Sequence, residues 1–112
     1  MRAFLPEKGM ELGNDISLAA SLPARLKGLL GKNKLEAGKG LLISPCKGIH
    51  TFFMKFPIDA VFLNKDNRIV ALVRSFPPNR MTSIYLKASS VLELPAGTLG
   101  VSVVVGDAIE FI

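Results

Sequence analysis

The chain contains one cysteine and one histidine, and they stand four residues apart in "CKGIH" as Cys46 and His50. A structural zinc ion needs a full set of Cys and His ligands, usually supplied as two such pairs, and the sequence offers no second pair. Asp59 or Glu93 would have to complete an unusual mixed site, so we expect no metal. A Cys–His nucleophile needs a thiolate stabilised by the imidazole and a third group, such as Asp59, that orients the base. The alternative is that Cys46 is a small buried apolar residue and His50 a hydrogen-bonded residue at a strand start.

Three charged residues interrupt apolar, strand-like sequence, namely Lys55, Asp59 and Glu93. A charge inside such a strand must be exposed, paired or functional, because burying it alone costs several kcal/mol. Lys55 and Asp59 flank Pro57 and could pair across a kink. Surface charge or a structural ion pair is the simpler interpretation. The functional hypothesis is a polar patch in which His50, Lys55, Asp59 and Glu93 bind a ligand or a peptide.

The net charge of +5 lies entirely in residues 1–55, which carry nine Lys/Arg and four Asp/Glu, whereas residues 56–112 carry five of each. The excess is densest in residues 25–55, where seven basic residues accompany Glu36 alone. A basic segment can attract nucleic acid or another anionic surface, and lysines in loops also keep small proteins in solution. Between residues 25 and 47 no aromatic side chain interleaves the lysines, so nucleic acid is not the favoured partner.

A chain of 112 residues is expected to form a single domain, residues 1–112, which can fold without a disulfide or metal. A single cysteine forms no internal disulfide and implies no oxidising compartment. The first twenty residues show no signal pattern, and no segment approaches the roughly 20 apolar residues of a membrane span. We therefore predict a soluble, cytoplasmic protein without a membrane span.

The apolar periodicity predicts one helix followed by strands. Leucines in "SLPARLKGLLGK" recur at helical spacing over residues 21–32, with Ser21 as N-cap and Gly31 as a stop. After residue 40 the period becomes two, which predicts strands at 41–44, 51–56, 58–64, 68–74, 89–94 and 107–112, besides one at 15–20. Both faces of the 58–64 and 68–74 strands are apolar, so these strands need cover on two sides. We predict a mainly β (α+β) fold: a small, barrel-like antiparallel sheet with one amphipathic helix packed on it.

Three blocks resemble the domain-of-unknown-function-192 family: "LAASLPARLKGLLGK", "KGIHTFFMKFPIDAVFLNKDNRIVALV" and "ASSVLELPAGTLGVSVVVGDAIEF". They occur in the family's order and span about residues 14–111. The resemblance implies a compact β-rich domain with a helix, and no activity or cofactor is established for the family. Many members are exported, whereas the first twenty residues here show no signal pattern, so we do not expect export of this chain. The matching signature positions are His50, Phe53, Met54, Lys55, Asp59, Phe62, Glu93, Leu94, Pro95, Gly97, Gly106 and Asp107.

Of these positions, Phe53, Met54, Phe62 and Leu94 are interpreted as core, and Pro95, Gly97 and Gly106 as turn geometry. The four polar residues His50, Lys55, Asp59 and Glu93 remain as ligand-binding candidates. We therefore favour a non-enzymatic binding or accessory module, without cofactor, for an unknown protein or small-molecule ligand. One alternative is a hydrolase or transferase that uses His50 with Asp59 and Cys46, and another is a nucleic-acid or anionic-surface binder that uses residues 25–55.

Overall fold

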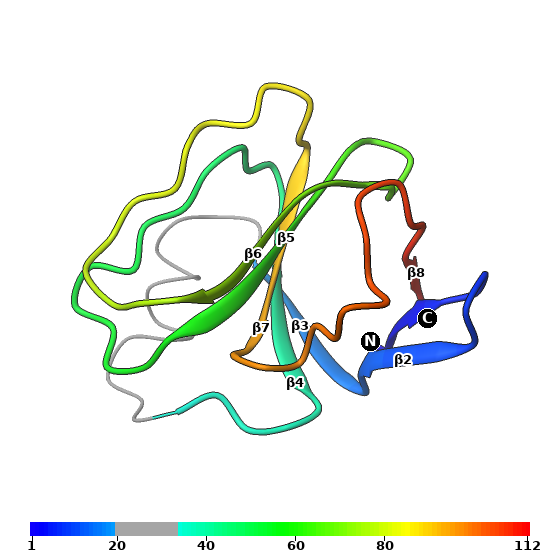
Figure 1. Cartoon of the computed structure of the whole chain (residues 1–112), viewed down its shortest axis with the longest axis horizontal. Coiled ribbons are helices and arrows are strands. Elements are labelled where there is room, and N and C mark those ends of the chain that lie inside the picture. Colours follow the sequence, from blue (N-terminus) through cyan, green and yellow to red (C-terminus); the bar gives the residue numbers. More distant parts are fainter. Residues whose placement is uncertain (20–33) are drawn as a thin grey trace.

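The computed structural model describes residues 1–19 and 34–112 (Figure 1). Its described part contains strands β1 (Ala3–Leu5), β2 (Met10–Gly13), β3 (Asp15–Ala19), β4 (Lys39–Ile43), β5 (Ile58–Leu63), β6 (Ile69–Phe76), β7 (Ser90–Pro95) and β8 (Glu110–Phe111). These strands form a five-stranded sheet of order β3-β4-β7-β5-β6 and a three-stranded sheet of order β2-β1-β8. Strands β3 and β4 pair in parallel, and the other neighbours pair antiparallel.

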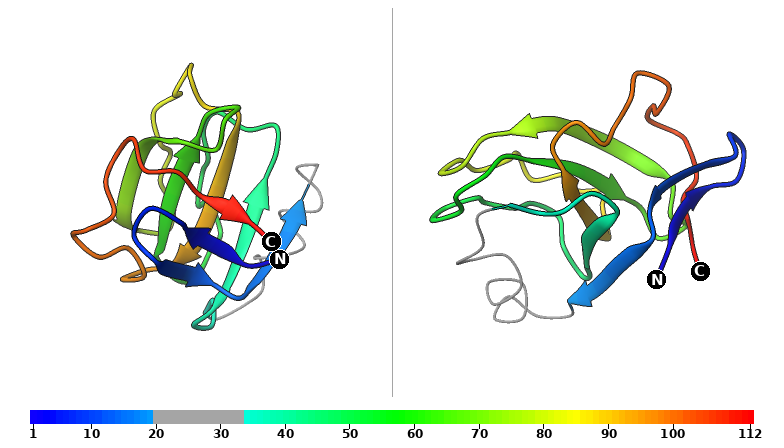
Figure 2. Two further views of the ribbon diagram at one scale, coloured as in Figure 1. Left: turned by 90° about the vertical axis from the view of Figure 1, so that its right-hand side faces the viewer. Right: turned by 90° about the horizontal axis from the view of Figure 1, so that it is seen from below.

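The small sheet and the long loops occupy opposite ends of the molecule. Strands β1, β2 and β8 lie together with both chain termini (Figure 1). The loops that follow β4 and β6 project together at the other end (Figure 2). Backbone hydrogen bonds between residues 49–51 and 80–82 join these two loops. One end of the molecule is therefore closed by a small sheet, and the described part of the other end is built from loops.

Strand β5 is buried along its whole length because both faces of the five-stranded sheet are covered. On one face lies the loop-side cluster, made of Ala19, Leu41, Ile43, Ile49, Met54, Phe56, Ile58, Ala60, Phe62, Ala71, Ala88 and Val91. The other face carries the sheet-side cluster, made of Ala3, Leu5, Leu12, Ile16, Val61, Leu63, Ile69, Leu92, Leu94, Leu99, Val103 and Ile109. Successive side chains of a strand point to opposite faces, so the expected two-sided apolar pattern of residues 58–64 is confirmed.

The predicted barrel-like antiparallel sheet was wrong, because the described strands form two separate sheets that do not close on each other. The parallel β3–β4 pair also departs from an all-antiparallel arrangement. Two-sided burial, which suggested a barrel, is supplied instead by the small sheet on one face and loops on the other. The described residues contain no helix to pack on the sheet, and the amphipathic helix predicted at 21–32 falls outside them.

Several strand predictions were confirmed and others were not. The strands predicted at 15–20, 41–44, 58–64, 68–74 and 89–94 correspond to β3, β4, β5, β6 and β7. The strand predicted at 51–56 was wrong, because these residues form turns and bends. Strands β1 and β2 were not predicted, since segments of three or four residues carry too little periodic signal. In the stretches 1–19 and 34–112, no helix is long and apolar enough to cross a membrane.

Candidate binding surface at the loop end

Asp59 is fully buried in β5, and its carboxylate accepts three backbone hydrogen bonds. The Ser75 N–H donates to Oδ1 at 2.8 Å, and the N–H groups of Gly97 and Leu99 donate to Oδ2 at 3.1 and 2.9 Å. Ser75 has a φ of 50° and lies where the β5–β6 pairing shifts register. A β-bulge of this kind leaves a backbone group without a ladder partner. The Asp59 carboxylate therefore clamps the bulge in β6 to the turn after β7.

Glu93 is also fully buried, but its side chain points to the other face of the sheet. The register places Glu93 opposite Ala60 of β5 and Leu41 of β4, and both neighbours belong to the loop-side cluster. Asp59 pairs with Leu94, whose side chain belongs to the sheet-side cluster. Because neighbouring strand positions alternate between faces, the thickness of the sheet separates the two carboxylates.

His50 and Lys55 lie on the loop that covers the loop-side cluster. His50 is half-buried, forms an isolated β-bridge with Met81, and accepts a hydrogen bond at Nδ1 from the Phe52 N–H at 3.3 Å. Its ring stacks on that of Phe52 with centroids 4.9 Å apart. Lys55 is exposed. The structure thus places three of the candidates, His50, Lys55 and Glu93, on the loop side of the sheet and Asp59 on the opposite side.

Cys46 is half-buried against the loop-side cluster, and its thiol donates to the Gly48 carbonyl at 3.1 Å. Among residues 1–19 and 34–112, no three His, Cys, Asp or Glu side chains gather closely enough to hold a metal ion. The cysteine therefore packs as a small apolar residue and donates a weak hydrogen bond to the backbone of its own loop.

The two loops at the open end are joined through Thr51, which is fully buried. Its hydroxyl donates to the Pro77 carbonyl at 2.7 Å and accepts from the Arg80 N–H at 3.1 Å. Its backbone N–H donates to the Arg80 carbonyl at 2.9 Å, and its carbonyl accepts from the Asn79 N–H at 2.8 Å. We call residues 49–55 and 77–82 the loop tip. Through these hydrogen bonds, Thr51 fixes the two loops of the loop tip to each other.

Phe53 stands at the loop tip in a strained and exposed conformation. Its φ is 67°, a value rare for a bulky side chain, and 82% of the residue is accessible to solvent. Its N–H donates to Asn79 Oδ1 at 3.0 Å, and Asn79 also has a positive φ, 61°. Strain of this kind persists only where surrounding contacts enforce it, and it is concentrated at functional sites.

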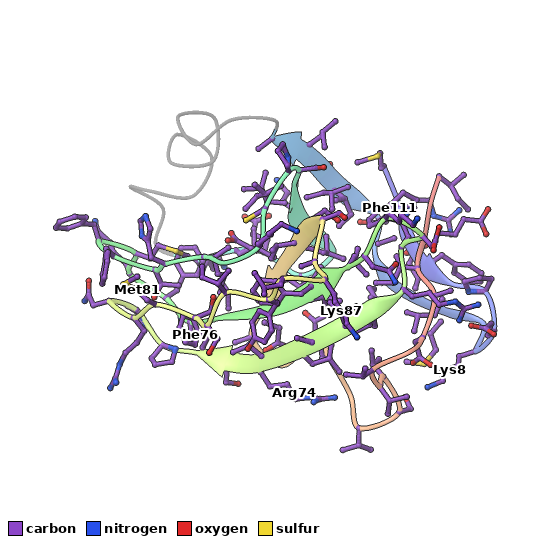
Figure 3. The ribbon with its side chains drawn as sticks, turned by 90° about the horizontal axis from the view of Figure 1, so that it is seen from above. Lys8, Arg74, Phe76, Met81, Lys87 and Phe111 are labelled. Carbon is purple, nitrogen blue, oxygen red and sulfur yellow. The ribbon has the colours of Figure 1, made fainter. Side chains whose placement is uncertain are left out.

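The surface around Phe53 is apolar and basic. Phe52 and Lys55 are exposed in the same loop as Phe53, and Arg80 and Met81 are exposed next to Asn79 in the paired loop. Figure 3 shows Met81 at the end of the molecule where the two loops run together. No Asp or Glu occurs in residues 44–58 or 76–92, the two chain segments that form and flank the loop tip. An apolar tip bordered by cations, in segments free of acidic side chains, is suited to an anionic partner.

Asp107 stabilises the loop between β7 and β8, on the sheet side of the molecule. The Lys8 ammonium donates to its carboxylate at 2.7 Å and the Val104 N–H donates to it at 3.0 Å. These two hydrogen bonds, with the Lys8 and Arg68 charges, hold the pKa of Asp107 below its usual value, although partial burial opposes them. Asp107 therefore ties residues 104–107 to the N-terminal hairpin.

Comparisons with known proteins agree with this β-rich architecture. A family model described as DUF192, Uncharacterized ACR, matches residues 5–111. The chain belongs to the domain-of-unknown-function-192 family. No match was found among curated proteins.

Two solved structures share the fold of this family member. One is a Sinorhizobium meliloti 1021 protein, provisionally described as a transcription regulator, with 24% identity and a TM-score of 0.77 over 97% of this chain and 89% of its own. The other is a protein of unknown function from Novosphingobium aromaticivorans DSM 12444, with 19% identity and a TM-score of 0.73 over 99% of this chain and 93% of its own. At these identities the likeness establishes the fold alone.

The signature positions of the family behave differently from one another. Met54, Phe62 and Leu94 are buried as predicted, but the prediction that Phe53 is core was wrong. Positive φ values at Gly97 and Gly106 confirm their interpretation as turn residues. Phe53 was missed because the aromatic-rich segment "TFFMKF" was predicted to be a strand whose apolar side chains enter the core. The sequence "FPPN" at residues 76–79 predicts the second loop of the loop tip. It does not predict that Asn79 in this loop binds the backbone of Phe53.

Proposed function

We propose that this family member is a non-catalytic binding module that engages an anionic partner through the loop tip. The observation that carries the proposal is Phe53, which is held outward at a positive φ by the Asn79 side chain. Folding normally removes large apolar side chains from water, and an exposed apolar patch rimmed by polar or charged residues marks an interaction site.

The contacts of Asp59 support a non-catalytic role over the hydrolase or transferase alternative. A His–Asp pair requires the carboxylate to reach the imidazole. The three backbone N–H groups bound to Asp59 lie in β6 and in the turn after β7, and its side chain belongs to the sheet face opposite the loop with His50. In our proposal Asp59 is a structural clamp and Glu93 a buried residue of the loop-side face. His50 and Lys55 remain ligand-binding candidates at the loop tip.

The charge distribution supports an anionic partner. Residues 34–55 are the described part of the basic segment 25–55. Three lysines in this part differ in their contacts. Lys39 lies 4.0 Å from Glu36, and Lys47 donates to the carbonyls of Leu86 and Ala88. Lys55 is the described lysine of this segment that borders Phe53 at the loop tip.

Cytoplasmic placement remains a prediction from the sequence.

The experiment is a binding panel with three anionic probes: anionic lipid vesicles, a single-stranded oligonucleotide and heparin. The oligonucleotide also tests the nucleic-acid alternative, which the provisional description of the Sinorhizobium protein favours. The wild-type chain should bind at least one probe, and Phe53→Asn and Lys55→Glu should each weaken that binding. Failure to bind any probe, or binding that neither substitution changes, would refute the proposal.

A further inference from the structure

We infer that the anionic partner is a lipid bilayer, which the loop tip enters at the headgroup level. This inference rests on the proposed function and specifies its partner. A peripheral protein binds such a surface by burying apolar side chains at the boundary of the acyl chains while basic side chains meet anionic headgroups. The loop tip and the segment that follows it supply both groups.

The exposed apolar side chains favour a bilayer over a nucleic acid. Besides Phe53, the exposed residues include Met81 at 69%, Ile84 at 65% and Leu86 at 80%, all three in the loop that follows β6. Aromatic rings can stack on unpaired bases, but aliphatic side chains gain little from bases. All four side chains gain from transfer out of water into an apolar phase.

The cations and the rigidity of the loop tip support the same partner. Lys55 and Arg80 are exposed at the loop tip, and the two segments that form and flank it contain no Asp or Glu, so no carboxylate of those segments would repel an anionic headgroup. The hydrogen bonds of Thr51 and Asn79 fix the two loops to each other before binding. A preorganised tip loses less conformational entropy on insertion than a flexible loop would.

The absence of tryptophan from the sequence allows a direct test. The variant Phe53→Trp places a single indole at the loop tip, and Val101→Trp places one in the loop between β7 and β8, at a position that is 96% exposed. With vesicles of phosphatidylcholine and phosphatidylglycerol, the emission of Phe53→Trp should shift to the blue, because the indole leaves water. The emission of Val101→Trp should not shift, and equal behaviour of the two variants would overturn the inference.

Vesicle sedimentation measures the contribution of each group. Phe53→Ser should weaken binding by roughly tenfold to a hundredfold, as expected when a phenylalanine is no longer transferred out of water. Lys55→Glu should weaken binding to the anionic vesicles by roughly tenfold or more, with little binding of any variant to pure phosphatidylcholine. The matched controls Val101→Ser and Lys65→Glu change an exposed apolar and an exposed basic residue outside the loop tip, and they should bind like the wild type.

The remaining outcomes separate the inference from the proposed function. If the oligonucleotide or heparin binds in a Phe53-dependent manner and anionic vesicles do not, the bilayer is overturned and the binding module stands. If none of the three probes binds, both are overturned.

Discussion

Replacing Asp59 by asparagine tests whether its carboxylate is a structural clamp. Asparagine has the same shape but only one acceptor oxygen, so it cannot accept from Ser75 on one side and from Gly97 and Leu99 on the other. If the amide oxygen takes the place of Oδ2, the amide NH₂ group faces the Ser75 N–H. One buried donor then loses its acceptor, and two hydrogen bonds lose their ionic character.

The expected loss follows from those three contacts. An unsatisfied buried donor costs about 1–3 kcal/mol, and hydrogen bonds to charged groups contribute about 1.5–3 kcal/mol against about 1 kcal/mol for neutral ones. Relief from burying a charge offsets part of this loss. We expect Asp59→Asn to lower the free energy of unfolding by about 3 kcal/mol, and Asp59→Ala, which leaves all three donors without an acceptor, by about 5 kcal/mol.

The assay is urea unfolding followed by far-ultraviolet circular dichroism, in which the midpoint should fall and the slope should stay constant. Asp66→Asn is the matched control, because Asp66 is an exposed aspartate in the β5–β6 turn and should change stability by no more than about 0.5 kcal/mol. An Asp59→Asn protein as stable as the wild type would refute the clamp. If that stable protein had also lost binding, Asp59 would be a ligand-binding residue after all.

Three further predictions concern the loops. Phe53→Asn should raise the free energy of unfolding by about 1 kcal/mol, since asparagine tolerates a positive φ and an exposed ring loses no packing; a lower urea midpoint would contradict the assignment of strain. Thr51→Val should lower the free energy of unfolding by about 2 kcal/mol, because the Pro77 carbonyl and the Arg80 N–H lose a buried partner. Amide hydrogen exchange at the loop tip should accelerate, and an unchanged exchange rate would contradict the role of Thr51. Asp107→Asn should lower the melting temperature at neutral pH. Since the folded pKa of Asp107 is depressed, its contribution is complete above the unfolded pKa of about 4 and is lost as pH falls through the folded value. Melting curves of the variant and wild type should therefore converge in acid, and a constant difference would exclude this mechanism.

The sequence predicted the features that depend on local periodicity. Apolar residues on both faces of 58–64 and 68–74 indicated strands covered on two sides, and β5 is buried along its whole length, whereas β6 is buried only at Ile69 and Ala71. The same pattern could not tell a closed barrel from an open sheet covered on both sides, because strand burial is the same in the two cases. The strand predicted at 51–56 failed because its aromatic-rich composition suits a strand, whereas its loop conformation depends on contacts with residues 77–82 that the local sequence does not indicate.

The candidate site was predictable only as a set of unusual residues. Asp59 was recognisable as a charge within an apolar strand, but two of its partners lie 38 and 40 residues further along the chain. The outward position of Phe53 depends on Asn79, 26 residues away. Contacts of this kind are decided by the tertiary fold, so the sequence indicated that these positions matter without indicating how.

The pairing of the two loops through Thr51 has a consequence for protein engineering. The hydrogen bonds that orient Phe53 join residues 49–55 to residues 77–82. The loop tip contacts the sheet through buried apolar side chains such as those of Ile49 and Met54. Both loops could be exchanged together for those of another family member while β5, β6 and β7 are kept. Exchanging one loop alone would separate Thr51 from its partners, so the two segments should be transplanted together. For the same reason we expect the two segments to change together in evolution.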